Sequence, residues 1–181
     1  MSAHVAQGLT ELLPRLRRFA RGLTGSATDA DDLVQAACER ALRASDQYTE
    51  GTRLDSWLYR IVQTTWIDMA RGARRRAAHL DSLPAEHMAT AAPDAPAALT
   101  LGAVRRAVAA LPEDQRVLVM LVCVEGQTYR QAAEVLDLPI GTVMSRLSRG
   151  RATLRRLIEG EAPGDDTGTA EALRRSKETV G

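Results

Sequence analysis

The stretch TYRQAAEVLDLPIGTVMSRLSRGRATLRRLI, residues 128–158, decides the fold of the C-terminal half of this chain. Thr128 followed by Gln131 matches a capping box, in which a hydroxyl and a side-chain amide close the start of a helix reciprocally. Residues 137–141 (DLPIG) form a short turn, and a second helix is predicted from about Thr142. Two helices joined by so short a turn indicate a helix-turn-helix.

The second helix of this motif has two different faces. Its apolar residues gather on one side, and they are Val143, Leu147, Leu154, Leu157 and Ile158. The remaining surface carries hydroxyl and guanidinium groups, which can reach base edges and phosphates in a major groove. The candidate DNA-contact residues are Thr142, Ser145, Arg146, Ser148, Arg149 and Arg151. An ordinary helical hairpin with a solvated arginine face would show the same spacing.

Directly upstream, the run VLVMLVCV (117–124) is apolar throughout, and its composition allows either a buried strand or a buried helix. Pro112 followed by Glu113 is a typical helix start, because proline suits the first turn and acids favour the helix dipole. These signals favour a buried helix. With a further helix before Pro112, they define a second module, residues 99–160.

The N-terminal part of the chain is predicted to start with two amphipathic helices. The first covers residues 9–23 and contains Pro14, where the helix either begins or bends. Thr28 is the expected N-cap of the second helix, because a hydroxyl suits that position and aspartates follow it in the first turn. Leu42 is expected on the apolar side of the second helix.

A third helix is predicted over residues 54–76, after a polar loop at 45–53. Arginines and aromatic residues combine here as they do where proteins hold unpaired bases, which stack on rings while the backbone is neutralised. Trp57 and Trp66 are expected to pack in the core instead. The candidate contacts are Tyr48, Arg53, Arg60, Gln63, Thr64, Ile67, Arg71, Arg74 and Arg75. The three helices make up a first module, residues 1–76.

Charge divides the chain into four segments. The net charges are +3 for residues 1–76, −3 for 77–98, +3 for 99–160 and −2 for 161–181. Two basic modules suit a polyanion partner. Residues 77–98 hold three prolines and no Lys or Arg, and predict a flexible linker that reaches about 75 Å when extended. Residues 161–181 are predicted to be a disordered tail.

Composition excludes several classes of protein. Of 181 residues, 45% are hydrophobic, with Ala and Leu predominant. We therefore predict an all-α chain of two small helical domains joined by a flexible linker. The longest apolar run, 117–124, is far shorter than the roughly 20 residues of a membrane-spanning helix, so no membrane insertion is expected. No secretory signal is visible, which favours the cytoplasm.

Two cysteines, Cys38 and Cys123, are too few for a disulfide scaffold or a four-ligand zinc site. Both fall within apolar helical patterns and are expected to be buried free thiols. No spacing typical of metal ligands, or of a nucleophile with its base, is present in the sequence. We therefore expect no metal, no cofactor and no enzymatic activity.

Three blocks of this sequence together resemble the bacterial RNA polymerase sigma factors of the extracytoplasmic-function group. The blocks are DADDLVQAACERAL (29–42), LDSWLYRIVQTTWIDMARGARRR (54–76) and LPEDQRVLVMLVCVEGQTYRQAAEVLDLPIGTVMSRLSRGRATLRRL (111–157). The resemblance implies a promoter-specificity subunit that binds core RNA polymerase and promoter DNA. It also implies a role in a stress or signal response, with activity controlled by an anti-sigma factor.

The resemblance further implies roles for individual residues. The first module would bind polymerase and recognise and melt the −10 element, and the second would read the −35 element as duplex. In the −35 helix, Ser145, Ser148 and Arg149 would contact bases, with Thr142, Arg146 and Arg151 on phosphates. Residues 29–42 match the polymerase-binding helix of the family. The candidate polymerase contacts are Asp31, Asp32, Leu33, Gln35 and Glu39.

A stand-alone helix-turn-helix regulator that binds duplex operators is the alternative function. Such a regulator would carry a ligand-binding or phosphoacceptor domain in its first half. The first module shows no alternation of strands and helices and no glycine-rich loop, which disfavours this alternative. A stable complex with core RNA polymerase would discriminate between the two functions.

Overall fold

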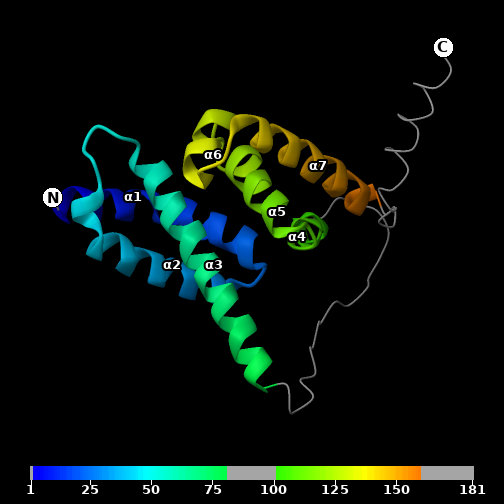
Figure 1. Cartoon of the computed structure of the whole chain (residues 1–181), viewed down its shortest axis with the longest axis horizontal. Helices are drawn as coiled ribbons and strands as arrows, with labels where there is room; N and C mark the ends of the chain where they lie inside the picture. Colours follow the sequence, from blue (N-terminus) through cyan, green and yellow to red (C-terminus); the bar gives the residue numbers. More distant parts are fainter. Residues whose placement is uncertain (1, 81–100, 160–181) are drawn as a thin grey trace, which may run out of the picture.

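The computed structural model describes residues 2–80 and 101–159, and every regular element in these two ranges is helical (Figure 1). The elements, in chain order, are α1 (Ser2–Thr24), α2 (Ala27–Arg43), η1 (Ser45–Gln47), α3 (Leu54–Leu80), α4 (Leu101–Ala109), α5 (Glu113–Val119), η2 (Met120–Val124), α6 (Tyr129–Leu136) and α7 (Ile140–Glu159). The prediction of an all-α chain is confirmed. Within the described ranges, no helix combines the length and apolarity needed to cross a membrane.

The first module consists of α1, α2, η1 and α3, which pack around one apolar core. Phe19 of α1 and Tyr59 of α3 are fully buried, and their rings meet edge to face with centroids 5.1 Å apart. Leu33 of α2 and Leu58 of α3 complete the contact between the three helices. Trp57 and Trp66 are half-buried and pack against this core, as expected.

Helix α1 is longer than predicted and passes through Pro14 without a break. Val5 and Leu9 extend the apolar stripe toward the N-terminus and are buried, so packing supports helix well before residue 9. Pro14 itself is exposed, and the helix carries it on its outer side. The tertiary contacts of the stripe outweigh the loss of one backbone hydrogen bond at the proline.

The predicted cap of α2 was wrong by two residues. Ser26, not Thr28, is the N-cap, and its hydroxyl accepts a hydrogen bond from the Asp29 amide at 3.3 Å. Gly25 has a φ of +75°, which ends α1 and reverses the chain at once, so α2 starts earlier than the sequence pattern suggests. Leu42, expected on the apolar side, is 45% exposed.

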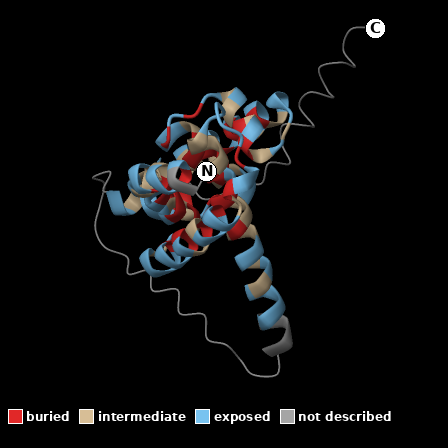
Figure 2. Cartoon of the chain, turned by 90° about the vertical axis from the view of Figure 1, so that its left-hand side faces the viewer, coloured by how far each residue is buried: buried red, intermediate tan, exposed pale blue. Residues whose placement is uncertain are grey.

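Helix α3 continues to Leu80, four residues into the segment predicted as linker. Figures 1 and 2 show that its C-terminal half extends beyond the helical bundle, and the arginines from Arg71 to Arg76 are exposed. The rest of the predicted linker, residues 81–98, and the predicted tail, residues 161–181, lie outside the described residues.

The second module consists of α4 to α7. The apolar run 117–124 is helical, so the alternative of a buried strand was wrong. Its last five residues form the π-helical turn η2, in which the Glu125 amide donates to the Met120 carbonyl at 3.0 Å. Cys123 lies on the outside of this turn and is exposed, contrary to expectation, while Cys38 is half-buried.

The two modules pack against each other, an arrangement we call the closed arrangement. Helix α1 contacts α4, α5 and η2, and α3 contacts α6. Figure 1 shows α6 beside the N-terminal half of α3. Gly22 of α1 lies at this contact, because a Cβ there would fall 2.2 Å from the Cε of Met120. The sequence indicates two modules but carries no signal for this contact between them.

Candidate nucleic-acid interface

The helix-turn-helix forms as the sequence predicts. The Gln131 amide donates to the Thr128 hydroxyl at 3.2 Å and the Thr128 amide donates to the Gln131 side chain at 2.8 Å, which completes the capping box. Asp137 ends α6 in the left-handed region with a φ of 54°. Helix α7 begins at Ile140, two residues earlier than predicted, because Pro139 suits a helix start and its carbonyl accepts from the Thr142 amide.

The two predicted faces of α7 are present. Val143 and Leu147 are buried against α5 and α6. Ser145, Ser148 and Arg149 are exposed, and Thr142 is half-buried near the start of the helix. The three exposed side chains are therefore available to a duplex that approaches this helix. The half-buried Thr142 lies in the first turn of the same helix.

Arg146 and Arg151, the arginines predicted to contact phosphates, are held by neighbours in the second module. The Arg146 Nε lies 3.5 Å from Oδ2 of Asp114. The Arg151 guanidinium donates to Sγ of Cys123 at 3.7 Å and to the Tyr129 hydroxyl at 3.5 Å, contacts that raise its pKa. These contacts fix the guanidinium groups of Arg146 and Arg151 against neighbouring residues of the second module.

Met144 was not among the candidate residues, although it is 52% exposed on α7. Together with Ser148 and Arg151 it lines a shallow hollow beside the exposed face of the helix. The spacing i, i+4, i+7 of these three residues was the signal that could have identified it. An exposed thioether can meet the methyl group of a thymine in a major groove.

The predicted −10 contacts on α3 follow its outward side. We call Arg60, Gln63, Thr64 and Ile67 the outer face of α3. Gln63, Thr64 and Ile67 are half-buried, and the Thr64 hydroxyl donates back to the Arg60 carbonyl at 2.9 Å. Arg71 and Arg75 lie further along the same helix and are exposed.

Tyr48 is not available for stacking in this structure, which corrects the expectation from its polar loop. The residue is 5% exposed, and its hydroxyl donates to the Thr52 carbonyl at 2.7 Å. Its ring packs against Trp57, with centroids 5.4 Å apart, and stacks near His4. The extension of α1 toward the N-terminus supplies His4, and so Tyr48 becomes part of the core.

Three predicted DNA-contact arginines are paired with acids. Arg53 binds Asp55 with two hydrogen bonds of 3.1 and 2.6 Å. Arg60 Nη2 lies 3.8 Å from Oδ2 of Asp137, and Arg74 pairs with Glu113. Asp137 and Glu113 belong to the second module, so two of these pairs cross between the modules.

Helix α2 presents an acidic surface. Asp31, Gln35 and Glu39 are exposed and follow one another at intervals of four residues, with Asp32 exposed beside them. Leu33, predicted as a polymerase contact, is instead fully buried in the core of the first module. The exposed Leu42 lies three residues beyond Glu39 and adds an apolar group to the end of this surface.

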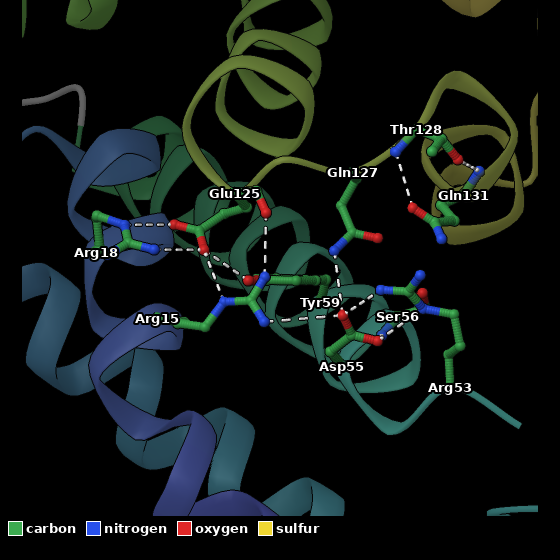
Figure 3. A network of polar contacts seen from close by, with 10 residues as sticks. All are labelled: Arg15, Arg18, Arg53, Asp55, Ser56, Tyr59, Glu125, Gln127, Thr128 and Gln131. Atoms are coloured by element: carbon green, nitrogen blue, oxygen red, sulfur yellow. Dashed lines mark hydrogen bonds and ion pairs between the residues drawn. The ribbon is translucent and has the colours of Figure 1, made fainter.

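A buried carboxylate joins the two modules (Figure 3). The Glu125 side chain is 0% exposed and accepts from the Tyr59 hydroxyl at 2.7 Å. It also accepts from Nε and Nη2 of Arg18 at 2.8 and 2.9 Å, and from Nε of Arg15 at 3.3 Å. Burial, together with the hydrogen bond to Glu125, raises the pKa of Tyr59. All three donors belong to the first module.

The network continues through Asp55. The Gln127 side chain, from the second module, donates to Oδ2 of Asp55 at 3.2 Å, and Arg15 Nη1 lies 3.9 Å from the same oxygen. Burial works to raise the pKa of Asp55, but hydrogen bonds from Arg53, Gln127 and its neighbouring amide outweigh burial and lower it. No motif or spacing in the sequence indicates this network.

Two family models match the chain, Sigma-70 region 2 over residues 9–76 and Sigma-70, region 4 over residues 101–154. The chain is 34% identical over 162 residues to the ECF RNA polymerase sigma factor EcfG of Rhodopseudomonas palustris (strain TIE-1), a match that covers 90% of this chain and 88% of that protein. It is 31% identical over 142 residues to the ECF RNA polymerase sigma-E factor of Escherichia coli (strain K12), covering 72% of this chain and 74% of that protein.

Solved structures give a similar result. The chain resembles the sigma factor RpoE from Bartonella quintana, solved in complex with the anti-sigma factor NepR, with a TM-score of 0.74 and 32% identity. That match covers 85% of this chain and 96% of the other. It also resembles CnrH, solved in complex with the cytosolic domain of CnrY, with a TM-score of 0.63 and 24% identity. That match covers 90% of this chain and 92% of CnrH, and at that identity it supports the fold alone.

Proposed function

This chain belongs to the extracytoplasmic-function family of RNA polymerase sigma factors, and from that membership we propose how its two modules divide the work of transcription initiation. Factors of this family are not enzymes. They bind core RNA polymerase and direct it to promoters. In this chain the first module docks on polymerase and opens the −10 element, and the second reads the −35 element as duplex.

The observation that carries the proposal is the exposed face of α7. Ser145, Ser148 and Arg149 extend from one side of a capped helix-turn-helix, where a major groove can receive them. Arg149 suits the O6 and N7 atoms of a guanine, and each serine suits several base edges. Thr142, Arg146 and Arg151 then fix the register on phosphates.

The outer face of α3 is proposed to hold the −10 element as single strand. Removing a base from the duplex costs a few kcal/mol. Capture of the unpaired base on protein surfaces returns about 1–3 kcal/mol for each base. Arg71, Arg74 and Arg75 follow the same helix and supply charge for the backbone, which favours a strand running along α3.

The acidic surface of α2 is proposed as the polymerase contact. Asp31, Asp32, Gln35 and Glu39 are exposed on a module whose net charge is otherwise positive. Such a patch repels DNA and suits a protein partner with a basic surface. An anti-sigma factor that competes for these surfaces is a further proposed partner, because the similar RpoE was solved with one. Work on chromosomal promoters would place the chain in the cytoplasm.

The test is reconstitution with purified core RNA polymerase, followed by run-off transcription from promoter fragments selected by the holoenzyme. We expect a stable complex by size exclusion and transcripts that are lost when either promoter element is scrambled. A chain that forms no complex with core polymerase, yet protects duplex operators from cleavage by itself, would instead be a stand-alone regulator.

A further inference from the structure

We propose that Met144 is a specificity-determining residue of α7, which recognises one thymine of the −35 duplex by the methyl group on its C5 atom. The inference rests on the proposed function, which places the exposed face of α7 in the major groove. It deepens that function by adding one apolar contact to a face whose other contacts are polar, and by assigning that contact to one kind of base.

The first step of the argument is the exposure of Met144. Its side chain is 52% exposed, and among the large apolar residues of the described ranges only Leu101 is more exposed. Removal of apolar surface from water is favourable, so this side chain gains free energy from any apolar partner that covers it. A single exposed apolar residue is ordinary on a protein surface. The identity of the partner therefore has to come from the neighbours of Met144.

The second step is the position of Met144 along the helix. Helix α7 begins at Ile140, so Met144 starts its second turn, directly before Ser145 and one turn before Ser148. In helix-turn-helix proteins the N-terminal residues of the second helix contact base edges. Met144 and Ser148 are about 6 Å apart along the helix axis, at about 1.5 Å per residue, which is close to two base-pair steps. Both side chains can therefore meet base edges in one groove.

The third step is the shallow hollow beside Met144. Tyr129, the first residue of α6, and Leu147 of α7 contribute apolar atoms to its lining, together with Met144 itself. In the major groove, thymine is the base that presents a methyl group. An apolar hollow at the border of a polar helix face is complementary to that methyl group, because both lose contact with water when they meet.

The fourth step is the charge around the hollow. Arg151 and Arg155 line it as well, and none of the described residues that line it is acidic. The Arg151 guanidinium is held there by the Tyr129 hydroxyl at 3.5 Å and by Sγ of Cys123 at 3.7 Å. A duplex offers a methyl group in its groove and phosphates along the border of that groove. The combination of an apolar hollow with two cations therefore favours DNA as the occupant.

The fifth step is the effect of a thioether on the other bases. Methionine has no donor, and its sulfur is only a weak acceptor. At a cytosine, Met144 would cover the N4 amino group without accepting its hydrogen bond, and at a guanine it would leave O6 and N7 without a donor. A covered polar group that lacks its hydrogen bond costs free energy. Met144 therefore favours thymine both by what it covers and by what it leaves unpaired elsewhere.

The test is a double-mutant cycle between Met144 and the methyl group, in holoenzyme reconstituted from the full chain. Each thymine of a selected −35 element is replaced singly by deoxyuridine, which lacks the methyl group and keeps the same hydrogen-bonding atoms. Affinities are measured by competition anisotropy. We expect wild type to bind one uracil duplex about three- to tenfold more weakly than the thymine duplex, and Met144→Ala to bind the two equally.

Two further variants serve as controls. Met144→Leu keeps an apolar side chain of similar volume and is expected to retain most of the preference for thymine over uracil. Leu101→Ala removes an exposed apolar side chain from α4 of the same module and should keep the full preference. Each preference compares two duplexes with one variant, so any change in the amount of folded protein cancels.

A thymine-to-uracil change that costs wild type nothing at every position, or that costs Met144→Ala as much as wild type, would overturn the assignment and leave the proposed function intact. The assignment is equally wrong if Met144→Ala binds every duplex normally but core polymerase more weakly, because Met144 would then contact a protein. A wild-type chain that forms no holoenzyme with core polymerase would contradict the proposed function itself.

Discussion

Arg146 and Arg149 lie three residues apart on α7 and are both arginines, yet their surroundings differ. Arg146 is half-buried and lies 3.5 Å from Asp114, while Arg149 is exposed on the side with Ser145 and Ser148. A cation held by its own module suits a fixed phosphate contact. An arginine that extends freely suits the edge of a guanine.

Arg149→Ala is therefore expected to weaken −35 duplex binding by about 1–3 kcal/mol and to relax the base preference at one position. Arg105→Ala, an exposed arginine on α4, is the matched control for charge and should leave that preference unchanged. Anisotropy titrations against a set of duplexes with single base changes measure both effects. Equal weakening on every duplex would assign Arg149 to a phosphate.

Asp55 predicts a dependence of stability on pH. Its pKa is lower in the folded chain than in the unfolded chain, where an Asp has a pKa near about 3.9. The stabilisation is therefore complete above about pH 4 and is lost as the pH falls through the lower, folded value. We expect Asp55→Asn to show a shallower loss of stability than wild type below about pH 4 in urea denaturation. Parallel curves for the two chains would contradict this role.

Single residues show where sequence reasoning reaches its limit. Ser145, Ser148 and Arg149 were placed correctly on an exposed face, because helical periodicity depends only on neighbours along the chain. Tyr48 and Leu33 were assigned to partners, although the structure buries both. Their burial depends on contacts between elements, at His4 for Tyr48 and in the shared core of the first module for Leu33.

At the scale of the element, the start of α2 depends on one hydroxyl. Ser26→Ala is expected to destabilise the chain by about 1 kcal/mol, because the Asp29 amide loses its capping acceptor. Thr28→Ala, two residues later and exposed, should cost clearly less. Urea unfolding of the two variants provides the comparison. Equal losses would restore Thr28 as a contributor to the cap.

Most helices could be predicted from the sequence, since their apolar spacing and end signals are local. The capping box of α6 and the helical nature of residues 117–124 are examples. The π-helical turn η2 could not be predicted, because one extra residue in a turn leaves the apolar pattern almost unchanged. Cys123 lies in that turn and is exposed, although the apolar pattern predicts a buried position for it.

At the scale of the whole molecule, the contact between modules had no signal in the sequence. Arg15 and Arg18 occupy positions on α1 that a helical wheel assigns to solvent. Glu125 directly follows the apolar run 117–124, and in the sequence it indicates only where that run ends. The residues that meet are separated by 107 to 110 positions along the chain. Only the packed structure brings them together.

In the closed arrangement the acidic surface of α2 remains exposed, so it is accessible to polymerase. We expect Asp31→Arg with Asp32→Arg to abolish binding to core polymerase, because both carboxylates are exposed and charge reversal opposes a basic partner. Glu11→Arg with Asp46→Arg is the matched control in the same module and should bind normally. Unchanged affinity of the first variant, measured by interferometry, would remove α2 from the contact.

Arg116 has a consequence for how the closed arrangement can be detected. From the second module it donates at 2.7 Å to the Leu23 carbonyl in the last turn of α1, and also to the Leu111 carbonyl at 2.9 Å. When the modules part, that last turn loses the cation which neutralises its end. Its amides should then fray and take up deuterium faster. Deuterium uptake over residues 21–25, measured by mass spectrometry, would therefore report separation of the two modules without any label attached to the chain.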